Sequence, residues 1–233
     1  MRGMTCVFHG GKIRNSLYIT SMLHMRSILF HLAIFSGIAI AHAEAIRDSS
    51  AWRDAQRILP QLAKQHRAAK SFALKFEARA MGADGEPLPP SKGSLLVADS
   101  GRFRLEHAGG TVVCDGKALR QYTPSTKQVI IRDAADAGGA DGILLRFLDA
   151  RPVNASHLKK GLRVVLDPTA TKENLDSLIV TLDPGNAIRS VETQDGAGNR
   201  VTYVVKSLRY GVHISTRDFT LQPPPGTETV DMR

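Results

Sequence analysis

Cysteine is almost absent from this chain, since the 233 residues contain only Cys6 and Cys114. If residues 1–43 are removed on export, Cys114 is the single cysteine left. An intramolecular disulfide is then excluded, and a metal site built on thiolates is not expected. We interpret Cys114 as a small apolar residue of a strand, with a reactive thiol as the alternative.

Motifs of catalysis and of phosphate binding are also missing. No His-Glu-x-x-His helix and no Gly-x-Ser-x-Gly turn occurs, and Gly138-Gly139 lacks the lysine of a phosphate-binding loop. The pair Asp133 and Asp136 lies in a predicted loop, where solvated carboxylates are expected. Four histidines follow residue 43 without partners at ligand spacing: His66, His107, His157 and His213. The sequence therefore predicts a protein that is not an enzyme and holds no metal or cofactor.

Acidic residues are absent from residues 1–43, which inflates the formal net charge of +9. Without that segment the chain has 27 basic and 22 acidic residues and is only mildly basic. The basic residues are dispersed, which argues against a nucleic-acid binder. A mildly basic protein is suited to an anionic membrane surface or an acidic partner.

A long apolar run is missing too, because the longest one covers about 14 residues of the stretch 28–41 and a bilayer needs ~20. This run follows Met25-Arg26 and ends in small residues at Ala41 and Ala43. The pattern is typical of a secretory signal peptide at 25–43, cleaved after Ala43. An uncleaved anchor or a buried helix is the alternative. Translation can start at Met1, Met22 or Met25. We therefore expect a leader over residues 1–43 and a single exported, periplasmic domain over residues 44–233.

Helical spacing opens the predicted domain. Apolar residues recur from Trp52 to Leu62 after a capping pair at Ser49-Ser50, which predicts a helix that ends near Ala69. Pro60 lies inside this pattern and is expected to kink or interrupt the helix.

From Ser71 onward the period changes to two, as in strands with one buried and one wet face. The alternation and the turns between the runs predict about eleven strands. They lie at residues 71–79, 93–98, 102–107, 111–114, 119–122, 127–132, 162–166, 178–182, 187–193, 201–205 and 214–221. A short apolar helix is expected at 143–148, after a loop at 134–142 and before Pro152. A sheet of this size must curl and be covered. The predicted fold is therefore mainly β with helices (α+β), an incomplete, strongly curved antiparallel β-barrel under a helical lid.

Several segments resemble the outer-membrane lipoprotein carrier family (LolA-like). They are residues 101–106 (GRFRLE), 112–119 (VVCDGKAL), 122–124 (YTP), 127–129 (KQV) and 219–230 (FTLQPPPGTETV). The opening helix followed by Ser71-Phe72 is similar as well. Taken in order, the resemblance covers residues 50–231.

The resemblance implies a monomeric periplasmic chaperone that hides the acyl chains of lipoproteins in a hydrophobic cavity. Such a carrier accepts lipoproteins from an inner-membrane release complex and passes them to an outer-membrane receptor. Relatives of this fold carry other lipids or act as sensory modules, so fold alone does not fix the ligand. The alternatives are a carrier of another lipid or glycolipid and a sensory interaction module.

Apolar positions on the sheet faces are the candidate lipid-binding residues, although any one of them can also be plain core. The cavity candidates are Phe76, Leu95, Val97, Phe103, Leu105, Val180 and Tyr203. The lid candidates are Leu144, Phe147 and Leu148, because the glycine-rich lead-in and Pro152 are typical of hinges. One departure concerns Asp99-Ser100, which stands where the family has an Arg-Pro pair whose arginine helps to close the lid. Arg102 or Arg104 is the candidate substitute.

Overall fold

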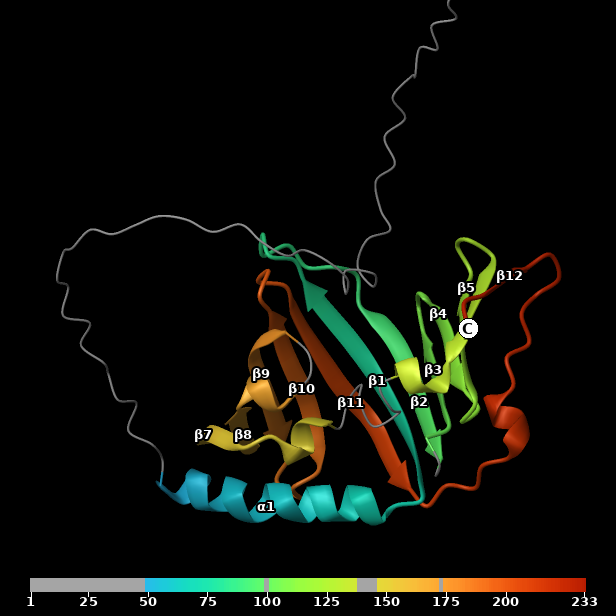
Figure 1. Cartoon of the computed structure of the whole chain (residues 1–233). Coiled ribbons are helices and arrows are strands. Elements are labelled where there is room, and N and C mark those ends of the chain that lie inside the picture. The colour runs from blue at the N-terminus through green and yellow to red at the C-terminus, as the bar shows by residue number, and fades with distance from the viewer. Residues whose placement is uncertain (1–48, 99–100, 138–145, 172–173) are drawn as a thin grey trace, which may run out of the picture. The chain divides into compact units, whose positions relative to one another are not determined.

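The computed structural model describes residues 49–98, 101–137, 146–171 and 174–233 (Figure 1). One long helix, α1 (Ser49–Ala68), precedes the strands. The first six strands are β1 (Ser71–Met81), β2 (Ser91–Ala98), β3 (Phe103–His107), β4 (Gly110–Cys114), β5 (Ala118–Thr123) and β6 (Gln128–Asp133). The last six are β7 (Pro152–Leu158), β8 (Gly161–Leu166), β9 (Leu175–Leu182), β10 (Ile188–Asp195), β11 (Arg200–Tyr210) and β12 (Glu228–Asp231). Short 3₁₀ helices are η1 (Ala134–Ala137), η3 (Arg146–Asp149), η4 (Pro168–Ala170) and η5 (Thr216–Phe219).

The strands form one sheet in the order β12-β6-β5-β4-β3-β2-β1-β11-β10-β9-β8-β7. Neighbouring strands are antiparallel except β12, which pairs parallel to β6. The sheet does not close into a barrel, because β12 and β7 remain at its two edges. The predicted fold class is confirmed, with twelve strands in place of about eleven.

Helix α1 buries the side that the sequence pattern predicted. Ala51, Ala55, Ile58, Leu59 and Ala63 are all buried, at the spacing of one helical face. The predicted interruption is wrong, because the helix continues through Pro60 to Ala68. Pro60 is exposed, so its ring faces solvent, and water can reach the carbonyl that lacks a helical N–H partner.

Three strand predictions are also corrected. Strand β7 was missed because Ala155 is its only buried residue, so its sequence shows no apolar alternation. Its first residue is Pro152, which is tolerated because β7 is an edge strand. Strand β12 was missed because it has only four residues and none is buried. Residues 214–221 are not a strand and contain η5, where Ser215 and Asp218 form a capping box.

One irregular position in β10 and one in β11 keep the apolar side chains of these strands on the side of the sheet that faces the core. Lys206 has no partner in β1, because Lys75 pairs with Ser207 and Phe76 with Val205. Arg189 likewise has no partner in β9. Each is an extra residue of a β-bulge, which shifts the alternation by one position. Leu208 and Tyr210 therefore face the same side of the sheet as Tyr203 and Val205.

This apolar side of the sheet, here called the inner face, carries α1 and η3. Helix α1 packs against β7, β8 and η3 (Figure 1). Two exposed polar contacts join these parts, a 3.1 Å contact between Asp54 Oδ2 and His157 Nε2 and an ion pair between Arg67 and Asp149. Of the predicted apolar helix at 143–148, the structure describes Arg146 onward as η3, where Phe147 and Leu148 are buried. Leu144 lies outside the described residues.

Candidate functional site: an apolar inner face beside a cleft at α1

The inner face brings together all seven cavity candidates, because strand alternation places them on the same side. They belong to a single apolar cluster with α1 and η3. Phe76, Leu95, Val97, Phe103, Leu105 and Val180 are buried, and Tyr203 is half-buried. The rings of Phe76 and Tyr203 meet edge to face, with centroids 5.8 Å apart. Cys114 is buried on the same face, opposite Phe103.

The space under η3 is nearly filled by the protein's own side chains. A cavity of about 10 Å³, barely enough for one water molecule, remains there. Its lining residues are Leu74, Phe76, Phe147, Ile188, Val191, Val205 and Leu208. Phe147, a predicted lid residue, therefore occupies the middle of the inner face.

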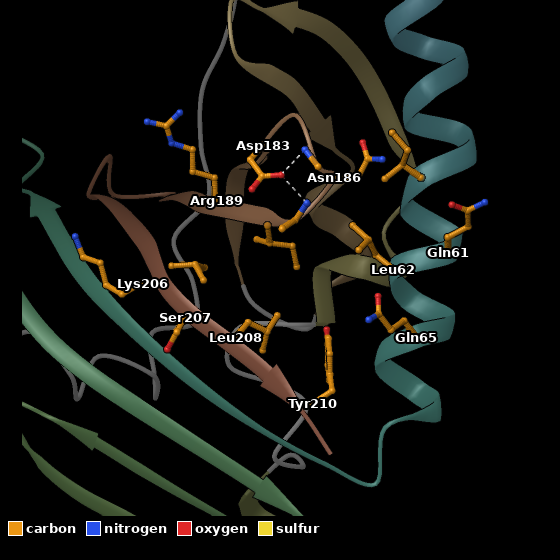
Figure 2. Close-up of a pocket in the computed structure, with 15 residues that line it drawn as sticks. Gln61, Leu62, Gln65, Asp183, Asn186, Arg189, Lys206, Ser207, Leu208 and Tyr210 are labelled. Atoms are coloured by element: carbon orange, nitrogen blue, oxygen red, sulfur yellow. Dashed lines mark hydrogen bonds between the residues drawn. The ribbon is translucent and has the colours of Figure 1, made fainter. Parts of the chain in front are cut away.

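A much larger cleft lies between α1 and the β9–β10 turn and β11 (Figure 2). Its volume is about 820 Å³. Figure 2 shows Leu62 and Gln65 of α1 facing Leu208 and Tyr210 of β11 across this space. Three of its lining residues, Ile188, Val205 and Leu208, also line the small cavity under Phe147. The cleft therefore leads directly to the inner face.

A second cleft of about 570 Å³ lies along another side of α1, toward η3 and the start of β7. Trp52, Leu59 and Ala63 of α1 face Leu148 and Ala150 there. Helix α1 is thus flanked by space along two sides, while its buried face packs into the apolar cluster and exposed polar contacts join it to η3 and β7. Exposed ion pairs contribute little to stability, so the burial of its apolar face is what mainly holds this helix in place.

The wall of the cleft beside β11 carries three charged residues, Asp183, Arg189 and Lys206, together with uncharged polar groups. Tyr210 lies there with its ring against Phe72, at 6.3 Å between centroids, and burial raises the pKa of its hydroxyl. The amide side chains of Gln65 and Asn186 also line the cleft. At the far end of α1, the hydrogen bond from Arg57 and the contact with His157 lower the pKa of Asp54.

The arginines proposed as substitutes for the family's lid arginine lie elsewhere. Arg104 donates hydrogen bonds to Glu106 at 2.7 Å and to the Thr220 carbonyl at 3.2 Å. The guanidinium of Arg102 lies 5.2 Å from the centroid of the Phe219 ring. Phe219, next to Thr220, belongs to an apolar cluster separate from the one that contains Phe147 and Leu148. Asp99-Ser100 lies outside the described residues.

Sequence reasoning missed the cleft residues, although it identified the inner face. Ile58 and Leu62 were recognised only as one stripe of a helix, and Leu208 and Tyr210 only become inner-face residues through the bulge at Lys206. Among the residues that the structure describes, no cluster of three metal-binding side chains occurs. None of the helices in those same segments is both long and apolar enough to cross a membrane.

Residues 67–222 match the family described as outer membrane lipoprotein carrier protein LolA. An outer-membrane lipoprotein carrier protein of Pectobacterium carotovorum subsp. carotovorum (strain PC1) is 27% identical over 168 residues, which cover 70% of this chain and 82% of that protein. A protein of the same name from Serratia proteamaculans (strain 568) is 25% identical over 214 residues, which cover 90% of this chain and 100% of that protein.

Among solved structures, a LolA superfamily protein from Nitrosomonas europaea aligns with a TM-score of 0.40 and 12% identity, over 72% of this chain and 97% of that one. An uncharacterized conserved protein from Thermus thermophilus aligns with a TM-score of 0.49 and 13% identity, over 76% of this chain and 99% of that one.

Proposed function

Because this chain belongs to the outer membrane lipoprotein carrier (LolA) family, we propose that it carries acylated lipoproteins across the periplasm, from the inner to the outer membrane. The observation that carries this proposal is the 820 Å³ cleft beside α1, which opens onto a continuous apolar face of the sheet. A carrier of this kind performs no bond chemistry and works by burial and release alone.

The acyl chains bind to the inner face after passing between α1 and β11. Each CH₂ removed from water contributes about 0.8 kcal/mol, so a few chains supply ample binding energy. The free protein keeps this face covered with Phe147 and Leu148, which shield it from water when no cargo is present. Loading displaces η3 and shifts α1, whose exposed polar contacts to the rest of the domain are weak.

Export to the periplasm follows from the proposed signal peptide at 25–43, cleaved after Ala43. The cargo then comes from an inner-membrane release complex and goes to an outer-membrane receptor, as the family implies. Sequencing the N-terminus of the exported protein tests this step. A mature chain that still carries Met25 contradicts it.

A carrier of another amphiphile, such as a glycolipid, is the second candidate. Gln65, Asn186 and Tyr210 in the cleft offer uncharged hydrogen-bonding groups, which suit a hydroxyl-rich head group as well as a lipopeptide. Mass spectrometry of the extracted ligand separates the two, since a lipidated peptide and a glycolipid differ in composition.

Co-purification is the direct experiment for lipoprotein transport. The protein isolated from the periplasm is expected to carry acylated lipoprotein, and its depletion is expected to leave lipoproteins in the inner membrane. Absence of any bound acyl species, together with normal lipoprotein localisation after depletion, contradicts the proposal. The variant Leu208→Glu, with a charge in the cleft, is expected to lose the cargo, whereas Lys160→Glu in the exposed β7–β8 turn is the control.

A further inference from the structure

The side of the sheet opposite the inner face, here called the outer face, collects basic residues on four adjacent strands, β2, β1, β11 and β10. Strand register places them together, because residues paired directly across antiparallel strands share a face. Glu77, for example, pairs with Lys92 on one side and Val204 on the other. All seven basic residues of this group are exposed: Lys75, Arg79, Lys92, Arg189, Arg200, Lys206 and Arg209.

Both bulges contribute to this cationic face. The extra residues that they insert are Arg189 in β10 and Lys206 in β11. Both residues are part of the lining of the cleft beside α1, and Figure 2 shows their side chains directed away from α1. Each bulge therefore does two things at once, since it restores the apolar alternation on the inner face and adds a cation to the outer face.

Few acids balance these charges. On the same four strands the outer face carries only Glu77 and Glu192, both half-buried. Glu77 pairs with Arg79 at 2.7 Å and with Lys206 at 3.0 Å. Within the described segments, no ion pair involves Lys75, Lys92, Arg189 or Arg209. The cationic face thus has an uncompensated positive charge that points into solvent.

We propose that this cationic face binds the anionic phospholipid head groups of a bilayer surface. Its charges are spread over four strands on long, exposed side chains, an arrangement that suits a diffuse layer of anionic head groups. The core of a protein–protein interface is instead depleted of lysine and other charged residues. Binding through the outer face holds the carrier at a membrane and leaves the cleft beside α1 open to a protein that delivers or receives cargo. The inference goes beyond the proposed function, because it concerns the opposite face and requires no cargo.

Vesicle co-sedimentation with the exported protein tests the proposal, once mass spectrometry has shown that the leader is absent. The protein is expected to bind phosphatidylglycerol-containing vesicles and not pure phosphatidylcholine vesicles. Binding is expected to disappear between about 0.01 M and about 1 M salt, as the screening length falls from ~30 to ~3 Å. Each basic residue near an anionic surface changes affinity by about fivefold, so Lys75→Gln/Arg209→Gln is expected to weaken binding about thirtyfold.

The matched control is Lys159→Gln/Lys160→Gln, which removes the same charge from the exposed β7–β8 turn. It is expected to bind vesicles nearly as well as the unmodified protein, and circular dichroism of both variants verifies folding. Equal loss in the two double variants, equal binding to neutral vesicles, or no binding to anionic vesicles at low salt overturns the proposal. Binding of soluble polyglutamate but not of vesicles overturns it as well, and would assign the face to an acidic protein.

Discussion

The two faces of β2, β1 and β11 differ sharply in charge. The inner face of β1, β2 and β11 carries no charged side chain, whereas the outer face of the same three strands carries six basic residues and one acid, Glu77. The same backbone serves both, since successive residues point to opposite sides. The contrast suits the sheet to two tasks: the apolar face to the proposed binding of acyl chains, and the charged face to solvent or an anionic surface.

The largest change in stability is expected from truncating Phe147, which covers the inner face. Phe147 is 4% exposed, and Phe147→Ala is expected to lower the free energy of unfolding by roughly 3 kcal/mol through lost burial and a new cavity. Urea unfolding measures it, with Lys75→Ala on the outer face as the control, expected within about 0.5 kcal/mol of the unmodified protein. A change under about 1 kcal/mol for Phe147→Ala would mean that η3 hardly packs on the inner face.

The next largest effect is expected on acyl-chain binding, when a negative charge is placed on the inner face of β11 and not on its outer face. Leu208→Glu is expected to weaken binding of a fluorescent acylated lipopeptide by about a hundredfold, because it places a carboxylate on the apolar inner face beside Ile188 and Val205. Its neighbour variant, Arg209→Glu, leaves that affinity unchanged. Equal losses in the two variants would show that acyl binding does not depend on which face is altered.

Acid is expected to lower the stability of the fold by protonating Asp115 in the β4–β5 turn. Burial raises the pKa of its carboxyl, but the Ala118 and Lys117 N–H groups and Arg120 outweigh burial and lower the pKa to about 2. The folded pKa is depressed from 3.8, so the stabilisation is full above about pH 4 and is lost as the pH falls toward 2. After screening it is about 1–2 kcal/mol.

Unfolding measured from about pH 5 to about pH 2 is therefore expected to be less acid-sensitive in Asp115→Asn than in the unmodified protein. Acyl-lipopeptide binding at neutral pH should not change in this variant, because Asp115 lies far along the sheet order from β11. Identical acid sensitivity in the two proteins would rule out Asp115 as a source of it.

The smallest effect is expected from the tether between α1 and β7. Asp54→Asn removes the charge that contacts His157, but the pair is exposed and solvent screens it. The urea midpoint is expected to stay within experimental error at neutral pH. A clear drop would show that α1 is fixed firmly to β7, contrary to its proposed displacement on loading.

Ten of the twelve strands, and the inner face, could be predicted from period-two alternation. A strand that buries one side has apolar residues at every second position. Strand β7 has no such pattern, since it lies at the sheet edge and buries only Ala155. Strand β12 depends on parallel pairing with β6, a contact between residues about 100 positions apart that local pattern does not reveal.

The cleft could not be predicted for a related reason. It lies between Leu62 of α1 and Leu208 of β11. Strict alternation along β11 would place Leu208 on the outer face, and only the bulge at Lys206 brings it to the inner face. Helix continuity through Pro60 was mispredicted because intrinsic propensity was given more weight than the packing of a long amphipathic face.

Photo-crosslinking with a lipopeptide that carries a diazirine in its acyl chain tests the central claim most directly. The probe is loaded onto the exported protein, the complex is irradiated, and the labelled residues are mapped by peptide mass spectrometry. The probe is expected to label inner-face residues such as Phe76, Val205 and Leu208. Unlabelled lipopeptide should compete this labelling away. Labelling confined to outer-face positions around Arg209, or labelling that no competitor reduces, would contradict the assignment of the inner face to acyl chains.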